Sequence, residues 1–163
     1  MKVQVVMTTD IGFCNMADNL TKAAEIMWQK DCGVVPIVDE NRKVVGMITD
    51  RDICVATATR NQKPSDIAAR EMISGEVICC AADDKIETAL KKMKKNQLKR
   101  LPITDANGEL IGILSISDVL SCERKAKKLR KQIYSTLKAI STPRPIVLKE
   151  MTGQAKDLFA TVQ

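Results

Sequence analysis

The sequence contains an internal repeat, and this repeat constrains the fold more than any other feature. A shift of 66 residues superposes the matching positions in order, with one extra residue in the second copy between Met72 and Ala82. A unit of about 60 residues buries too little surface alone, so two copies are expected to pack together. We therefore expect a first repeat over residues 1–59, a linker over 60–67, a second repeat over 68–123 and an extension over 124–163. The matched pairs are Leu20 and Ile86, Ala23 and Ala89, Met27 and Met93, Pro36 and Pro102, Asp39 and Asp105, Gly46 and Gly112, and Asp52 and Asp118.

Each repeat shows the same order of secondary-structure signals. A short apolar run, at residues 12–14 and 77–79, precedes an acidic helix cap, which is Asp18 in one copy and Asp83 or Asp84 in the other. A helix with apolar residues at i, i+3, i+4 and i+7 follows, and then two β-branched runs flank a tight polar turn. A second helix begins at Asp50 or Ser117. The pattern predicts an α+β fold of two pseudo-symmetric β-α-β-β-α units.

Composition argues against an enzyme. The 163 residues include no histidine, the commonest general base near neutral pH and the commonest metal ligand. The six cysteines form no Cys-x-x-Cys pair, so they indicate buried thiols in a reducing compartment rather than a zinc site. Neither an apolar run of ~18 residues nor a secretory signal is apparent. We expect a cytoplasmic protein with no catalytic residues and no metal.

Two short motifs that follow the hairpins are the candidate ligand site. Thr49 and Asp52 in the first repeat match Ser115 and Asp118 in the second, at the predicted junction between a strand and a helix. A hydroxyl and free backbone amides at a helix start can bind a phosphate, and a carboxylate can accept hydrogen bonds from two ribose hydroxyls. The same spacing fits a capping box, in which both side chains satisfy amides of their own helix. Spacing alone leaves both interpretations open.

The order of these motifs resembles the CBS-domain family, in tandem. The resemblance rests on residues 33–39 and 44–52 in the first copy and on residues 99–105 and 110–115 in the second, and it covers about residues 3–123. It implies two CBS repeats that pair as a Bateman module with up to two clefts for adenosyl ligands. Such modules usually associate in pairs and act as energy or metabolite sensors.

The resemblance also implies roles for individual residues. Asp52 and Asp118 match the ribose-binding acids of the family, and its phosphate-proximal hydroxyls match Thr49 and Ser115. The family often has proline before the acidic helix cap, whereas this chain has alanine there, and this leaves the choice of base open.

The base pocket and the phosphate partners are expected nearby. Arg51 and Arg100 offer guanidinium donors to a phosphate, while the alternative interpretation, at least as good for Arg51, is a solvent-exposed charge. The residues implied for the base pocket are Phe13, Cys14, Val34, Val35 and Pro36 in one cleft, and Ile78, Cys79, Arg100, Leu101 and Pro102 in the other.

The formal charge of +6 lies in the last quarter of the chain. Residues 1–122 carry 16 Lys and Arg against 17 Asp and Glu, whereas residues 123–163 carry 10 against 3. Apolar residues recur there every three or four positions, so the pattern predicts a basic amphipathic helix that ends before Pro143 and Pro145. The apolar positions are Leu120, Ala126, Leu129, Ile133, Leu137 and Ile140, and the basic ones are Arg124, Lys125, Lys127, Lys128, Arg130, Lys131 and Lys138.

Two functions from different classes follow from these features. The first is a regulatory module that binds AMP, ADP, ATP or S-adenosylmethionine between its repeats, forms a homodimer through them, and signals to an effector protein. The second is a binder of nucleic acid or an anionic membrane surface that uses the basic helix and keeps the repeats as a dimerisation scaffold. We favour the first, because an apolar stripe this long is expected to pack on its own module or on a second subunit.

Overall fold

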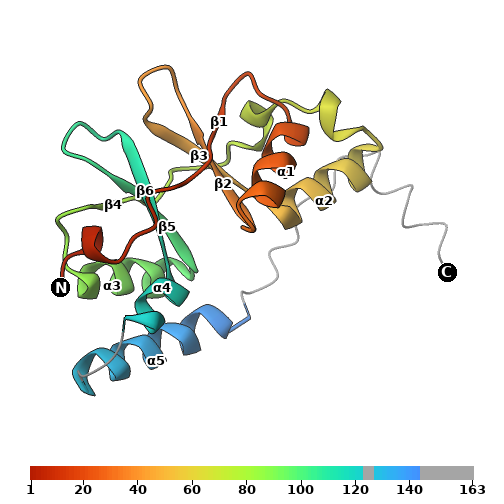
Figure 1. Ribbon diagram of the computed structural model, residues 1–163. Coiled ribbons are helices and arrows are strands. Elements are labelled where there is room, and N and C mark those ends of the chain that lie inside the picture. The colour runs from red at the N-terminus through yellow and green to blue at the C-terminus, as the bar shows by residue number, and fades with distance from the viewer. Residues whose placement is uncertain (123–126, 144–163) are drawn as a thin grey trace, which may run out of the picture.

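The computed structural model describes residues 1–122 and 127–143, except for the side chains of residues 127 and 128. Figure 1 shows two lobes, each with a small sheet and its own helices, and a further helix that runs along one of them. The first repeat contains β1 (Cys14–Asn15), α1 (Leu20–Gln29), β2 (Val34–Val38), β3 (Val44–Thr49) and α2 (Asp50–Arg60). The second contains β4 (Cys80–Ala81), α3 (Ile86–Asn96), β5 (Arg100–Thr104), β6 (Leu110–Ser115) and α4 (Ile116–Ser121). Three short 3-10 helices, η1 (Val3–Val5), η2 (Pro64–Asp66) and η3 (Ala69–Met72), and the helix α5 (Lys127–Ser141) complete the described elements.

The two sheets have the same topology and register. Their strand orders are β1-β2-β3 and β4-β5-β6, with a parallel first pair and an antiparallel second pair. Cys14 pairs with Ile37, and Cys80 pairs with Ile103, so the 66-residue shift holds through the first strand of each repeat. The expected strand over residues 77–79 and the expected extra residue are therefore wrong, because Cys80 is buried where Cys14 is buried. The α+β fold of two β-α-β-β-α units is confirmed.

The first helix of each repeat begins differently from the prediction. Asn19 caps α1, because its side chain accepts a hydrogen bond from Lys22 N at 3.1 Å, and α3 begins after Lys85. Asp18 accepts instead from Asn15 N at 2.7 Å, and Asp84 accepts from Ala81 N at 3.2 Å. These acids close the turn between strand and helix. The second helix of the second repeat begins at Ile116, one residue before the predicted start.

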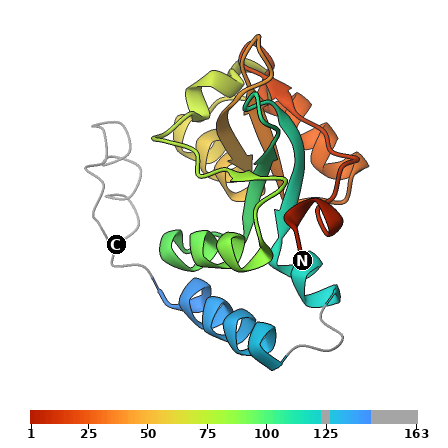
Figure 2. The same cartoon turned by 90° about the vertical axis from the view of Figure 1, so that its left-hand side faces the viewer.

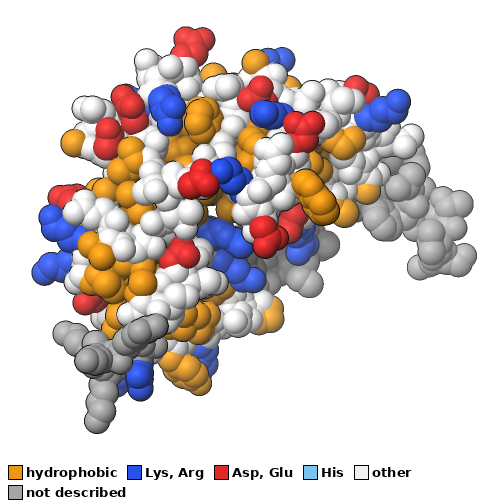
Figure 3. Space-filling model, viewed as in Figure 1, with side chains coloured by type: hydrophobic (Ala, Val, Ile, Leu, Met, Phe, Trp, Pro, Cys, Tyr) orange, Lys and Arg blue, Asp and Glu red, His pale blue; other side chains and the backbone are white. Residues whose placement is uncertain are grey.

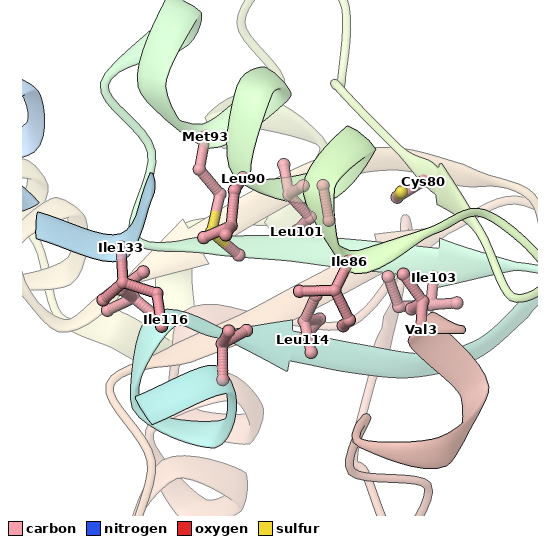
Figure 4. Close-up of a cluster of buried hydrophobic side chains, with 12 residues drawn as sticks. Val3, Cys80, Ile86, Leu90, Met93, Leu101, Ile103, Leu114, Ile116 and Ile133 are labelled. Atoms are coloured by element: carbon pink, nitrogen blue, oxygen red, sulfur yellow. The ribbon is translucent and has the colours of Figure 1, made fainter. Parts of the chain in front are cut away.

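The segment before each repeat packs on the other repeat. Val3 is fully buried in the core of the second repeat, and its amide donates to Asp84 O at 2.9 Å. Ile67, at the end of the expected linker, is fully buried in the core of the first repeat. Its carbonyl accepts from Leu20 N at 3.0 Å. Figure 1 shows the amino terminus beside α3, and Figure 4 shows Val3 among the side chains of α3, β5 and β6.

The two hairpins lie side by side and connect the repeats. Leu110 N donates to Arg42 O at 3.0 Å, and Lys43 and Glu109 form an isolated antiparallel bridge. A second bridge joins Thr8 to Ile113. The repeats therefore meet through backbone hydrogen bonds at the hairpins and at the amino-terminal segment.

Helix α5 packs on α3 of its own module, as Figure 2 shows. Ile133 is 2% exposed, and the neighbouring apolar side chains of α5 are partly buried against the same core. The favoured prediction left open whether the stripe packs on its own module or on a second subunit, and Leu129, Ile133, Leu137 and Ile140 pack on the core of their own module. None of the described helices is long and apolar enough to cross a bilayer.

The predicted stripe does not extend back through α4. Leu120 is 42% exposed, and α4 ends at Ser121 before α5 begins at Lys127. The predicted positions Arg124, Lys125, Ala126 and Pro145 lie outside the described residues, as do the side chains of Lys127 and Lys128.

Candidate functional site

The junction between β3 and α2 forms a capping box. Asp52 N donates to Thr49 Oγ1 at 3.1 Å, and Thr49 N donates to Asp52 Oδ2 at 2.9 Å. The hydroxyl of Thr49 also lies 2.7 Å from the same carboxylate oxygen. The capping interpretation of the motif is therefore correct as geometry, and it uses Oδ2 of Asp52.

The junction between β6 and α4 repeats this arrangement. Asp118 N donates to Ser115 Oγ at 3.1 Å, and Ser115 N donates to Asp118 Oδ2 at 2.7 Å. Within the described residues, Oδ1 of Asp118 accepts no hydrogen bond from the protein. A carboxylate has about four acceptor positions, so capping leaves Asp118 able to accept from a ligand.

Two cavities lie between the repeats, and they are related by the 66-residue shift. The first has a volume of about 600 Å³, and the second about 280 Å³. Each takes its strand–helix junction from one repeat and its loops from the other. The first is lined by Val34, Gly46, Met47, Thr49, Arg51, Met72, Ser74, Glu76, Val77, Ile78, Asn96, Gln97, Leu98, Lys99, Arg100, Pro102 and Ile140. The second is lined by Thr8, Asp10, Ile11, Gly12, Lys30, Asp31, Cys32, Val34, Arg100, Ile113, Ser115, Ser117 and Asp118.

Charged side chains of both signs surround this region. Arg100 lines both cavities, and Lys30 forms an ion pair with Asp10 at 2.5 Å in the lining of the second. On the face seen in Figure 3, basic and acidic side chains both border the hollow between the repeats.

The structure brings eight of the predicted site residues to these cavities. Those at the first are Val34, Thr49, Arg51, Ile78, Arg100 and Pro102, and those at the second are Val34, Arg100, Ser115 and Asp118. Asp52 contacts Thr49 but does not line the first cavity.

The other predicted residues lie away from both cavities. Successive strand residues point to opposite faces, so Val35 and Leu101, which are fully buried, face the core while Val34 and Arg100 face the cavities. Cys14 is also fully buried in the core. The remaining three are Phe13, Pro36 and Cys79. The ring of Phe13 lies 4.8 Å from the guanidinium of Arg42, and Pro36 is buried in β2. The carbonyl of Cys79 accepts a hydrogen bond from Lys92 Nζ at 2.9 Å.

The buried cysteines are poor nucleophiles. Burial raises the pKa of Cys14 to about 11, and the negative charge of Asp18 adds to this shift. Burial, together with the hydrogen bond from its thiol to Asp84, raises the pKa of Cys80 to about 12. That hydrogen bond is in turn the main reason why the pKa of Asp84 is lowered. These side chains are part of the fold and not of the cavities.

Sequence reasoning missed the loops that complete each cavity. The first cavity includes Ser74 and Glu76, and the second includes Thr8 and Asp10 at the positions 66 residues earlier. These polar residues belong to no motif. The repeat itself contained the signal, because the same shift that pairs the capping boxes also pairs these loops.

Family comparison agrees with this architecture. A model of the CBS domain matches residues 3–58 and 66–125, which is most of the chain. The chain belongs to the CBS-domain family. A relative by sequence, an uncharacterized protein of Methanopyrus kandleri, is 32% identical over 123 residues. That match covers 76% of this chain and 63% of the relative, so the chain spans less than two thirds of the relative's length.

Solved CBS domain pairs share the fold. The CBS domain pair of protein MJ0100, solved with 5′-methylthioadenosine and S-adenosyl-L-methionine, has a TM-score of 0.64 and 22% identity, and the match covers 74% of this chain and 98% of that one. A CBS domain protein of Pyrobaculum aerophilum complexed with AMP has a TM-score of 0.67 and 15% identity, with 83% and 99% of the two chains covered. At these identities, the similarity shows the common fold.

Proposed function

We propose that this CBS pair is a regulatory module that binds an adenine nucleotide or an S-adenosyl compound between its repeats. The observation that carries the proposal is that each cavity is built from the strand–helix junction of one repeat and the loops of the other. A ligand in either cavity therefore contacts both repeats, and its affinity depends on their relative position. The ligands named for the two solved neighbours, AMP in one and two adenosyl compounds in the other, support this ligand class.

We assign the ribose contact to Asp118, because Asp52, its counterpart in the first repeat, does not line the first cavity. Asp118 lines its cavity, and its Oδ1 can accept the two vicinal hydroxyls of a ribose. Ser115 Oγ accepts from Asp118 N, so the hydroxyl proton of Ser115 can be donated to the ligand. Arg51 lines the first cavity, where its guanidinium can donate to a phosphate, whereas the hydroxyl of Thr49 in the same lining donates to Asp52 Oδ2 at 2.7 Å.

An adenine ring needs an apolar slot with few polar groups. Val34, Ile78 and Pro102 supply apolar side chains to the first cavity. Val34 also borders the second cavity, together with Ile11 and Ile113. Phe13, Cys14, Val35, Pro36, Cys79 and Leu101 do not line these slots, so we assign them no contact with the base.

Titration calorimetry with AMP, ADP, ATP and S-adenosylmethionine tests the proposal. Asp118→Asn keeps an oxygen for the Ser115 amide but removes the charge that two ribose hydroxyls would contact. We expect binding of at least one of these ligands, and a loss of about tenfold in affinity at the second cavity in this variant. Asp83→Asn, at an exposed acid that lines neither cavity, is the matched control. Absence of binding by all four ligands would contradict the proposal.

Helix α5 is the element through which we expect a partner to sense the ligand. Gln97 lines the first cavity, and its Nε2 donates to Ala139 O at 2.9 Å and to Thr142 O at 3.1 Å, at the end of α5. Ile140 of α5 lines the same cavity. Hydrogen exchange of α5 amides should therefore slow when a nucleotide fills the first cavity, and unchanged exchange would argue against this route.

A homodimer through the CBS pairs belongs to the same proposal. Trp28 on α1 is 88% exposed, and Val55 on α2 is 48% exposed, so the first repeat presents apolar side chains that a second copy could cover. Because Trp28 is the single tryptophan, its emission should shift to shorter wavelength as the protein concentration rises through the dimerisation range. A sedimentation profile of monomers at all concentrations would contradict the dimer.

The alternative function, binding of nucleic acid or an anionic surface, depends on α5. A helix that binds a membrane surface inserts its apolar face, but in this protein that face is occupied by α3 and the second core. The exposed Lys131 and Lys138 leave a basic face for phosphate contacts. No described contact favours that function over the sensor.

A further inference from the structure

The two cavities have matching positions but different charges. Position by position, Arg51 in the first corresponds to Ser117 in the second, and Gln97 in the first corresponds to Asp31 in the second. Lys99 of the first corresponds to Gly33, which does not line the second. Each of these differences makes the first cavity more positive than its counterpart, whereas Lys30 of the second, which corresponds to the neutral Asn96 of the first, acts in the opposite direction. Glu76 and Asp10, which also correspond, are both acidic and cancel in the comparison.

The charges that face a ligand differ further because of pairing. In the first cavity, Arg51, Lys99 and Arg100 form no ion pair with a described residue, and Glu76 is the one carboxylate among the described lining residues. In the second, Lys30 is paired with Asp10, so the other charged residues of the lining are Arg100 and the two carboxylates of Asp31 and Asp118. The described lining of the first cavity thus has a cationic excess, and that of the second has none.

The first cavity, which has the cationic excess, is also the larger of the two. The first cavity, at about 600 Å³, is roughly twice the second, at about 280 Å³. Pockets for small molecules usually hold about 300–1,000 Å³, so the first has room for a nucleotide with its phosphates, and the second is at the lower limit.

We infer that the two cavities take different adenosyl ligands: a phosphorylated adenosine nucleotide in the first, and an adenosine derivative without phosphate in the second. This inference rests on the proposed function and divides its ligand class between the sites. Arginine donates to phosphate oxygens through a rigid fork, so Arg51 and Arg100 favour the nucleotide in the first cavity. In the second, Asp31 and Asp118 repel a phosphate but accept hydrogen bonds from hydroxyls or tolerate a positive sulfonium. Discrimination comes from this repulsion as much as from the attraction.

The test exchanges corresponding residues in the full-length chain. AMP and 5′-methylthioadenosine share the adenosine group but differ in the phosphate, and calorimetry measures the affinity of each alone and with the other at saturation. In the wild-type chain, we expect AMP to bind while 5′-methylthioadenosine already occupies its own site. Arg51→Ser should lower the affinity for AMP by about tenfold and change the affinity for 5′-methylthioadenosine by less than about twofold. Higher salt should lower the affinity for AMP but not the affinity for 5′-methylthioadenosine.

Two further variants complete the design. Lys22→Ser removes an exposed positive charge on α1 outside both cavities, and we expect it to leave both affinities unchanged. Ser117→Arg places the first cavity's cation in the second, and AMP should then compete there with 5′-methylthioadenosine. Thermal melting checks that each variant is folded.

The outcomes separate the inference from the proposed function. Competition between AMP and 5′-methylthioadenosine for one site in the wild-type chain, or an unchanged AMP affinity in Arg51→Ser, would overturn the division of ligands and leave adenosyl binding intact. If neither these compounds nor ADP, ATP or S-adenosylmethionine binds, the proposed function falls and the inference falls with it.

Discussion

At the residue scale, the two oxygens of the Asp118 carboxylate have different surroundings. Oδ2 accepts from the amide of Ser115, while Oδ1 accepts no hydrogen bond from the described residues, and Asp118 lines the second cavity. The pattern Ser-x-x-Asp left a cap and a ligand contact open as alternatives; the structure shows the cap, and the proposed ligand contact is compatible with it because a carboxylate has more acceptor positions than one amide uses. What the sequence did not indicate is the difference between the repeats, since Asp52 does not line its cavity.

Removal of the second capping box should lower stability. Asp118→Ala removes the acceptor of the Ser115 amide, and we expect the free energy of unfolding to fall by about 1 kcal/mol. Asp118→Asn should lose less, because the amide oxygen can still accept. Urea denaturation measures both changes, and equal stability of Asp118→Ala and the wild-type chain would show that the cap contributes nothing.

The cysteines should differ strongly in reactivity. Cys54 and Cys122 are exposed, whereas Cys14 and Cys80 are buried with pKa values raised to about 11 and about 12. The thiolate is the reactive form, so alkylation of the native protein at pH 8 should modify the exposed pair and spare the buried pair. Mass spectrometry of the digested protein identifies the alkylated cysteines. Rapid modification of Cys80 without denaturant would be inconsistent with its burial.

The raised pKa of Cys80 also has a consequence for stability at high pH. A thiol whose pKa is raised from 9.0 to about 12 by folding stabilises the fold fully below pH 9. That contribution is lost as the pH rises through about 12. The stability difference between the wild-type chain and Cys80→Ala should therefore shrink in urea titrations carried out from pH 8 to pH 11, and a constant difference would contradict the assignment.

At the element scale, periodicity and turn chemistry predicted the helices and hairpins. Apolar spacing indicated α1 and α3, and the Asn107-Gly108 turn fits the observed φ of +82° at Gly108. The first hairpin has no glycine at its turn, and Arg42 adopts a φ of +59° there. Cap positions were less predictable: Asp18 and Asn19 are both good caps, and only the backbone geometry decided that Asn19 caps the helix.

Helix α5 should contribute to the stability of the second repeat. Ile133 is 2% exposed and packs in the core that α3 shares with the sheet. Ile133→Ala should lower the free energy of unfolding by about 2–5 kcal/mol through lost burial and a cavity. Lys131→Ala, at an exposed site of the same helix, should change it by less than about 0.5 kcal/mol. Equal effects of the two variants in urea denaturation would mean that α5 does not pack as described.

At the scale of the whole molecule, the repeats exchange their leading segments. Val3 is buried in the second core and Ile67 in the first, so a boundary drawn along the chain does not coincide with a boundary in space. Sequence patterns could not predict this exchange, because periodicity reports local faces and not the partner that covers them. The loops that complete the cavities were missed for the same reason.

The exchange predicts an unequal effect of two neighbouring valines. Val3 is fully buried, whereas Val5 is 70% exposed. Val3→Ala should lower the free energy of unfolding by about 2 kcal/mol, and Val5→Ala should have little effect. Urea denaturation distinguishes them, and similar midpoints would show that the amino-terminal segment does not pack on the second repeat.

The contact of Gln97 with the end of α5 would link ligand binding in the first cavity to the binding of any molecule that displaces α5. Any molecule that pulls α5 off α3 must break the hydrogen bonds to Ala139 O and Thr142 O and withdraw Ile140 from the first cavity. If such a molecule lowers the affinity for the ligand by some factor, the ligand must lower the affinity for that molecule by the same factor, because the four binding equilibria form a closed cycle. The coupling free energy could then be measured either as the change in affinity for the ligand or as the change in affinity for the molecule that binds α5.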